Sequence, residues 1–203
     1  MMLHTILDYI LANRMEFAGF ITTAVAIWLT TRRNMLCWPI TLVAAVVYLT
    51  VFFHSKLYSD ALLQCFFLSL TLYGWWHWWR GARAAGEVRV EPLRPRPMLI
   101  AIALGVVGSF LLGWIMTHLG AALPYRDATL ASFSLVASWW QARKHIANWW
   151  LWIVVDFFYV GMYINKSLYI TAVLYSVLAM LAVLGIRDWS RAAAKTVQAQ
   201  TAA

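Results

Sequence analysis

One carboxylate stands in the middle of an aromatic stripe near the centre of an apolar segment. Asp156 lies about midway along the run from Ile146 to Ile164, where a polar side chain would sit at roughly bilayer depth. Residues at spacings of three and four share its helix face, namely Trp149, Trp152, Asp156, Tyr159 and Tyr163. Aromatic faces and one carboxylate suit a flat, cationic, water-soluble molecule. The alternative is an Asp that only bonds a neighbouring helix.

A second polar face follows the third apolar segment, through Gln64 and Thr71. The Gln64 amide can donate and accept together, as recognition of a sugar hydroxyl or a carboxamide requires. Thr71 is a second candidate, although its hydroxyl could instead bond a carbonyl of its own helix. Asp60, near the start of this segment, is better explained as a helix cap.

The elements that must position these residues are apolar helices. The chain is 63% hydrophobic and 12% charged, which is far from the balance of a soluble domain. At about 20 residues per crossing, seven transmembrane helices are predicted: 16–31, 35–53, 60–79, 98–118, 127–141, 146–164 and 168–186. The first and fifth are short, so their ends are the least well defined.

The chain also matches itself at an offset of 111 positions, without a gap. The matched residues include tryptophans, glycines and charges: Trp28 with Trp139, Arg32 with Arg143, Trp38 with Trp149, Tyr48 with Tyr159, Gly74 with Gly185, and Trp78 with Trp189. We therefore predict a duplicated unit. Two copies of a three-helix unit can have the same orientation in the membrane only if one further helix links them. The prediction is therefore an all-α membrane protein with a parallel 3+1+3 arrangement.

In this scheme one transmembrane domain, 1–203, holds repeat 1 at 16–79, the linking helix at 98–118 and repeat 2 at 127–189. The two copies differ at polar positions: Asp156 corresponds to Ala45, Gln64 to Tyr175 and Thr71 to Ala182. A residue that serves only the architecture would be expected in both copies. The difference favours a ligand-binding role, and Tyr175 joins the candidate substrate-binding residues.

Charge predicts the orientation. Four basic residues fall on one side of the predicted helices (Arg14, Lys56, Arg126 and Lys166) and twelve on the other (Arg32, Arg33, Arg80, Arg83, Arg89, Arg94, Arg96, Arg143, Lys144, Arg187, Arg191 and Lys195). Cytoplasmic loops carry the excess of Lys and Arg. The amino terminus is therefore predicted outside and the carboxyl terminus in the cytoplasm. The net charge of +8 is assigned to contact with anionic lipid rather than with nucleic acid.

Several shorter segments carry their own expectations. Residues 1–13 are expected to form an interfacial helix or to extend the first span, 81–97 a cytoplasmic loop, and the residues after Trp189 a frayed tail. Gly105, Ser109 and Gly113 give the linking helix a small-residue face. That face could pack within its own bundle or against a second protomer, so a homo-oligomer stays open.

Catalytic chemistry is disfavoured. The sequence contains no Ser/His/Asp arrangement, no His-Glu-x-x-His, no phosphate loop and no dinucleotide fingerprint. Cys37 and Cys65 lie inside predicted helices without a Cys-x-x-Cys pair, so neither a metal site nor a disulfide is expected. No enzyme activity and no cofactor are predicted.

From Glu16 to Trp189 the chain resembles the nicotinamide riboside transporter (PnuC-type) family of bacterial vitamin transporters. The resemblance is strongest in two stretches: Lys56-Leu57-Tyr58 through Gln64 to Tyr73-Gly74-Trp75, and Asn148-Trp149-Trp150-Leu151-Trp152 through Asp156 to Lys166-Ser167-Leu168-Tyr169. Trp149 and Trp152 match the family's Trp-x-x-Trp signature. The resemblance implies two helix triplets around a linker, similar to the parallel repeats of SWEET proteins.

It also implies facilitated diffusion across the bacterial inner membrane, with the substrate trapped by a cytoplasmic kinase. By position, Gln64, Trp149, Trp152 and Asp156 fall where the family lines its substrate site. Asp156 stands where Asn is usual, and Thr71 where Asn can occur. A carboxylate suits the cationic rings of nicotinamide riboside and thiamine better than neutral riboflavin. Nicotinamide riboside is therefore the first expectation, followed by thiamine. A structural membrane protein without a ligand is the alternative from another class.

Overall fold

Seven helices account for nearly all the residues that the computed structural model describes, which are 14–54, 58–86, 88–120, 123–165 and 168–201. They are α2 (Arg14–Thr31), α3 (Cys37–His54), α4 (Tyr58–Ala85), α5 (Pro95–His118), α6 (Pro124–Ala142), α7 (Ala147–Asn165) and α8 (Tyr169–Thr201). Each overlaps one of the seven predicted apolar runs. The segment 1–13 lies outside the described residues.

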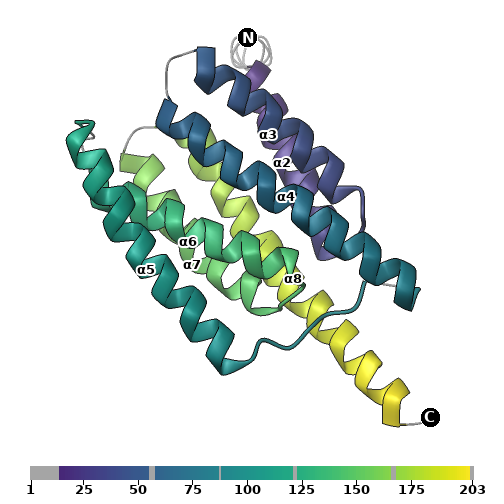
Figure 1. Ribbon diagram of the computed structural model, residues 1–203. Coiled ribbons are helices and arrows are strands. Elements are labelled where there is room, and N and C mark those ends of the chain that lie inside the picture. The colour runs from purple at the N-terminus through teal and green to yellow at the C-terminus, as the bar shows by residue number, and fades with distance from the viewer. Residues whose placement is uncertain (1–13, 55–57, 87, 121–122, 166–167, 202–203) are drawn as a thin grey trace.

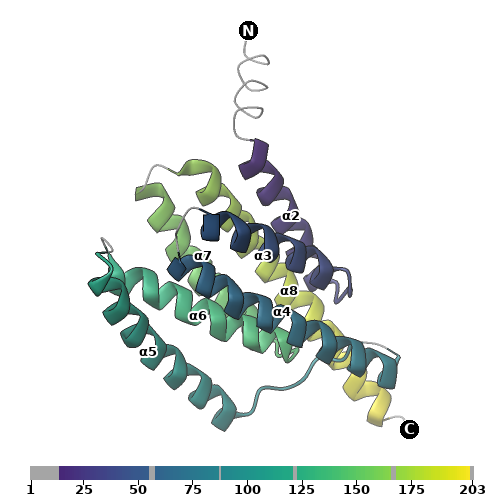
Figure 2. The ribbon, with the colours of Figure 1, turned by 45° about the horizontal axis from the view of Figure 1, so that its top comes forward.

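Six of the helices pack side by side in one bundle (Figures 1 and 2), and their contacts close into a ring. Going round it, α2 packs on α3, α3 on α4, α4 on α6, α6 on α7, α7 on α8, and α8 returns to α2. The seventh helix, α5, packs on the outside of α6. The order of the helices around the ring places α3 opposite α7, so a site on the inner face of α7 faces α3.

Two helices run further than the sequence predicts. α4 continues to Ala85, and the predicted loop is shortened to a connector between Ala85 and Pro95. α8 continues to Thr201, where a frayed tail is expected from the sequence. The physical reason is the same at both places, since Ala, Arg, Lys and Gln are strong helix formers even where no apolar run continues. Gly86, with a φ of 75°, follows the last residue of α4.

The small-residue face of α5 packs within its own bundle. Its buried residues are Ala101, Gly105, Ser109 and Gly113, spaced four apart. A Cβ added at Gly105 would lie 3.1 Å from the Phe133 ring of α6, and Ser132 donates a hydrogen bond to the Gly105 carbonyl at 2.8 Å. These residues therefore let the α5 and α6 backbones approach closely.

Four tryptophans fill the middle of the ring at one end: Trp38, Trp78, Trp149 and Trp189, each at most 4% exposed. Their ring centroids form a chain, with 5.2 Å from Trp38 to Trp78, 5.7 Å from Trp78 to Trp189 and 5.3 Å from Trp189 to Trp149. Two indoles donate to carbonyls at the ends of other helices, Trp78 to Gln141 of α6 and Trp189 to Thr30 of α2, both at 3.2 Å. We call this group the tryptophan core.

The connector between α4 and α5 crosses the same end of the ring and is held by two turns. Arg33, in the turn between α2 and α3, donates from Nη1 to the Val88 carbonyl at 3.0 Å. Lys144, in the turn between α6 and α7, pairs with Glu91 at 3.0 Å. Arg33 and Lys144 both have positive φ, 56° and 62°, a conformation that non-glycine residues rarely adopt.

Three described helical segments combine the length and the hydropathy needed to cross a bilayer, Pro95–His118, Ala147–Asn165 and Tyr169–Thr196. Ala18–Thr31 and Cys37–Thr50 are apolar but shorter. Large apolar side chains such as Leu104, Phe110 and Phe157 are more than 60% exposed on the outside of the bundle. Such a surface is stable in contact with lipid chains.

Candidate functional site

Asp156 is buried inside the bundle, on the inner face of α7. Its side chain is only 2% exposed. Among the described residues no hydrogen-bond partner reaches its Oδ1 atom. An unpaired polar atom in such a place costs free energy, and one that is retained calls for an explanation. A polar or cationic ligand at this position would supply the missing partner.

Three tyrosines gather next to Asp156, on the side away from the tryptophan core. Tyr159 and Tyr163 come from α7, and Tyr175 comes from α8. The Tyr159 and Tyr175 ring centroids are 4.6 Å apart, and Tyr163 lies 5.2 Å from Tyr175 and 5.9 Å from Tyr159. The Asp156 carboxyl is close enough to act electrostatically on the hydroxyl groups of Tyr159 and Tyr175. Tyr175, predicted from another helix, thus joins two residues of the predicted stripe in one cluster with the acid.

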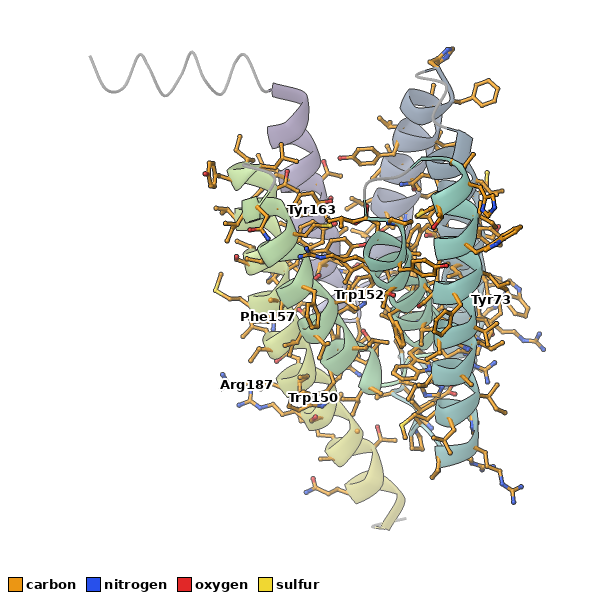
Figure 3. The ribbon with its side chains drawn as sticks, turned by 90° about the vertical axis from the view of Figure 1, so that its left-hand side faces the viewer. Tyr73, Trp150, Trp152, Phe157, Tyr163 and Arg187 are labelled. Carbon is orange, nitrogen blue, oxygen red and sulfur yellow. The ribbon has the colours of Figure 1, made fainter. Side chains whose placement is uncertain are left out.

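Trp152 lies one helical turn from Asp156, on the side of the tryptophan core. Figure 3 shows Trp152 and Tyr163 directed from α7 toward the middle of the bundle. Phe157 and Trp150, 72% and 62% exposed, lie on the outer face of the same helix. Seven buried side-chain atoms lack a hydrogen-bond partner in the part of the chain that is described, and four of them belong to α7, in Asn148, Trp149, Trp152 and Asp156. Unsatisfied polar groups are therefore concentrated on this inner face.

Trp149 lies in the tryptophan core, at the end of the stripe. It is 1% exposed, and its indole meets Trp189 edge to face. A Cβ added at Gly185 would collide with the Trp149 ring. These contacts give Trp149 a packing role in addition to its predicted place in the substrate site.

Gln64 and Thr71 lie on α4, which is separated from α7 by α6 in the ring. The Gln64 side chain is half-buried. Thr71 is 5% exposed, and its hydroxyl donates to the Phe67 carbonyl of its own helix at 2.8 Å. The structure therefore satisfies the Thr71 hydroxyl locally, which was the alternative considered from the sequence.

Two further polar residues of the site come from α6 and were not predicted from the sequence. The Ser134 hydroxyl donates to the Leu130 carbonyl of its own helix at 2.8 Å and lies close to the Tyr159 hydroxyl. Asp127 acts electrostatically on Tyr159 and Tyr163, and its Oδ1 is buried without a partner among the described residues. Asp127, Ser134 and Ser138 are spaced seven and four apart, so a search for polar stripes would have found this face.

Apolar helices around a buried carboxylate and aromatic face define a multi-pass membrane protein with a polar site inside the bilayer region. Residues 13–191 match the nicotinamide mononucleotide transporter family, and the chain belongs to this family of membrane transporters.

Two transporters of known name and one crystal structure are similar to this chain over most of its length. The chain is 26% identical over 204 positions to the nicotinamide riboside transporter PnuC of Escherichia coli strain K12, covering 88% of this chain and 85% of that one. It is 28% identical over 179 positions to the riboflavin/roseoflavin transporter RibM of Streptomyces davaonensis, covering 86% and 83%. A crystal structure of the vitamin B3 transporter PnuC superimposes with a TM-score of 0.76 at 20% identity, over 95% of this chain and 87% of that one.

Proposed function

We propose that this protein carries nicotinamide riboside across the bacterial inner membrane by facilitated diffusion. The family and the nicotinamide riboside transporters among its relatives support this function. The observation that carries it is the buried Asp156, whose Oδ1 has no partner among the described residues and whose neighbours are aromatic. The pyridinium ring of nicotinamide riboside is flat and cationic, so it can stack on these rings while the carboxylate neutralises its charge.

The proposed substrate site combines all the candidate residues. Asp156 is the counter-charge, and Trp152 is the main stacking surface. Tyr159, Tyr163 and Tyr175 form the wall of the site on the side away from the tryptophan core. Gln64, from α4, binds hydroxyl or carboxamide groups. Trp149 and Thr71 have smaller roles, because the contacts of both are largely structural.

The proposed architecture is the parallel 3+1+3 repeat, similar to SWEET proteins, with 16–79 and 127–189 as the repeats and 98–118 as the linking helix. Contacts that recur 111 positions apart support it. Trp38 packs on Gly74 as Trp149 packs on Gly185, and the two indole hydrogen bonds to Gln141 and Thr30 also correspond. The amino terminus lies outside, and the end with the tryptophan core faces the cytoplasm.

In this orientation the tryptophan core separates the site from the cytoplasm. Release into the cell then requires the two repeats to move relative to each other, as in other transporters that bind at a repeat interface. No ion or nucleotide drives the step, and a cytoplasmic kinase makes uptake one-way by phosphorylating the vitamin. The protein itself catalyses no reaction.

Reconstituted transport tests the proposal. Proteoliposomes that contain a nicotinamide riboside kinase and ATP should accumulate phosphorylated vitamin, and uptake should saturate. Without the kinase, the internal concentration of free vitamin should only reach the external one. Accumulation of unmodified vitamin above that level, abolished by a protonophore, would contradict passive transport. Lack of any saturable uptake would favour a structural membrane protein.

Riboflavin is the second candidate, because the similarity to RibM covers most of both chains. Thiamine is a further candidate substrate, since it is a flat heteroaromatic cation. Calorimetric titration with all three vitamins separates them. Tightest binding of neutral riboflavin would contradict the role given to the Asp156 charge, whereas a preference for thiamine would keep that role and change the substrate.

A further inference from the structure

A strongly basic groove of about 250 Å³ lies between the turn after α2 and the extended part of α8. Its charged residues are Arg32, Arg33, Asp188, Arg191 and Lys195. Four positive side chains thus face one carboxylate. We call this surface the basic groove; it is separate from the substrate site, which lies on the other side of the tryptophan core.

Contacts within the protein neutralise only part of the positive charge of the groove. Arg32 Nη1 lies 3.8 Å from Asp188 Oδ2, and its guanidinium stacks over the Trp28 ring. Arg33 donates to the Val88 carbonyl. Within the described residues, no ion pair joins Arg191 or Lys195 to an acid. The groove therefore keeps two cations that a ligand could neutralise.

The other half of the molecule gives an internal comparison. Lys144, His77 and Arg80 stand 111 positions before or after Arg33, Asp188 and Arg191. There the connector supplies an anion, because Glu91 lies 3.0 Å from Lys144 Nζ and 3.7 Å from His77 Nε2.

Glu91 is bound there as an anion. Burial opposes its ionisation, but the hydrogen bond and charge of Lys144, with His77 and His145 nearby, outweigh that effect and lower the pKa of Glu91. In the basic groove the connector supplies only a backbone carbonyl, so the one carboxylate there among the described residues is that of Asp188. One of two related basic sites is thus neutralised by the connector, while the other keeps an excess of positive charge among the described residues.

We propose that the basic groove binds a phosphate-bearing ligand, either the headgroup of an anionic phospholipid or a soluble phosphate ester. Planar guanidinium groups match phosphate oxygens well, and three of the four cations are arginines. The position along the chain fits a headgroup, since α8 leaves the tryptophan core at Trp189 and carries Arg191 and Lys195 on its next turns. Basic pockets at such boundaries bind lipid headgroups.

The test is a titration of the purified full-length protein in neutral detergent, with the thermal unfolding midpoint as the readout. The probes are phosphatidylglycerol, phosphatidylcholine, inorganic phosphate and glycerol 3-phosphate. Phosphatidylglycerol or glycerol 3-phosphate should raise the midpoint, and phosphatidylcholine should not. A response to phosphatidylglycerol alone identifies the lipid as the source, and a response to the soluble probes identifies a free phosphate ester. No response to any anionic probe overturns the proposal.

Variants locate the site. Arg191→Gln with Lys195→Gln should weaken binding of the active probe by about tenfold or more, the effect of losing charge-assisted contacts. Arg80→Gln with Arg83→Gln removes the same charge from α4 and should leave binding unchanged. Asp188→Asn should tighten binding by about threefold, because it removes the one carboxylate that the described residues place in the groove. Lys195 is exposed, so Lys195→Gln alone serves if the double variant does not purify. Equal weakening by the α4 pair, or weaker binding by Asp188→Asn, would overturn the assignment.

Discussion

Helices α3 and α7 occupy opposite sides of the ring and begin with the same contact. Trp38 and Trp149 are both buried, and each packs against a glycine of the next helix along the chain, Gly74 of α4 or Gly185 of α8. Beyond that first turn the two helices diverge. They thus share one way of packing at the tryptophan core and differ toward the middle of the bundle.

The divergence concerns polar groups. On α3 the residue corresponding to Trp152 is Thr41, whose hydroxyl donates to the Cys37 carbonyl of its own helix at 2.8 Å. The residue corresponding to Asp156 is Ala45, which is buried and apolar. On α7 both positions carry buried polar atoms without partners among the described residues. Contacts present in both halves hold the helices together, whereas the polar groups present only on α7 belong to the proposed substrate site.

The largest expected effect concerns the shared contact. Gly185→Ala and Gly74→Ala each place a methyl group against a tryptophan ring and should destabilise the fold by about 1–3 kcal/mol. Gly161→Ala is the matched control on α7, since nothing lies within 4 Å of an added Cβ there. Thermal unfolding of the three variants measures the effect. Equal midpoints for Gly185→Ala and Gly161→Ala would show that the tryptophan contacts are not structural.

Asp156→Asn tests the difference between the helices most directly. It should weaken nicotinamide riboside binding by about 1–3 kcal/mol, the scale of a hydrogen bond to a charged group, while the unfolding midpoint stays close to the parent's. Phe157→Leu, on the outer face of the same helix, should change nothing. Calorimetric titration gives both values. Unchanged binding by Asp156→Asn would assign the carboxyl to helix packing.

Trp152→Ala should weaken binding by about 0.5–1.5 kcal/mol through lost stacking. Thr41→Ala, the corresponding change on α3, should leave binding unaffected because the Thr41 hydroxyl serves its own helix. The two titrations are compared with the same vitamin. A larger loss from Thr41→Ala would place part of the substrate against α3 and remove the proposed asymmetry.

The smallest effect is expected at Thr71. Its hydroxyl is bonded to the Phe67 carbonyl, so Thr71→Val should change binding by less than about 0.5 kcal/mol. Gln64→Leu, on the same helix, should weaken binding more, since it removes both an amide donor and an amide acceptor. The reverse order in the titrations would show that Thr71 turns toward the substrate when the vitamin binds.

The sequence predicted the helices well, because hydrophobic runs and helix periodicity are local properties. Asp156, Trp152, Tyr159 and Tyr163 could be placed on one face for the same reason. Helix ends were less predictable: α4 and α8 continue through polar, helix-favouring residues that an apolar-run criterion excludes. Segment 1–13 lies outside the described part of the chain, and the terminal orientation stays a prediction.

Tertiary structure decided which residues of different helices are in contact. Trp189 bonds the Thr30 carbonyl across 159 positions, and Tyr175 joins Tyr159 and Tyr163 from another helix. Such contacts depend on how the helices are arranged around the ring. The residue pattern within one helix does not predict that arrangement. The same holds for Glu91, whose place beside Lys144 depends on the path of the connector. The sequence by itself determined which residues share a helix face. The packing of the helices determined which of those faces holds the fold together and which keeps buried polar groups without partners among the described residues.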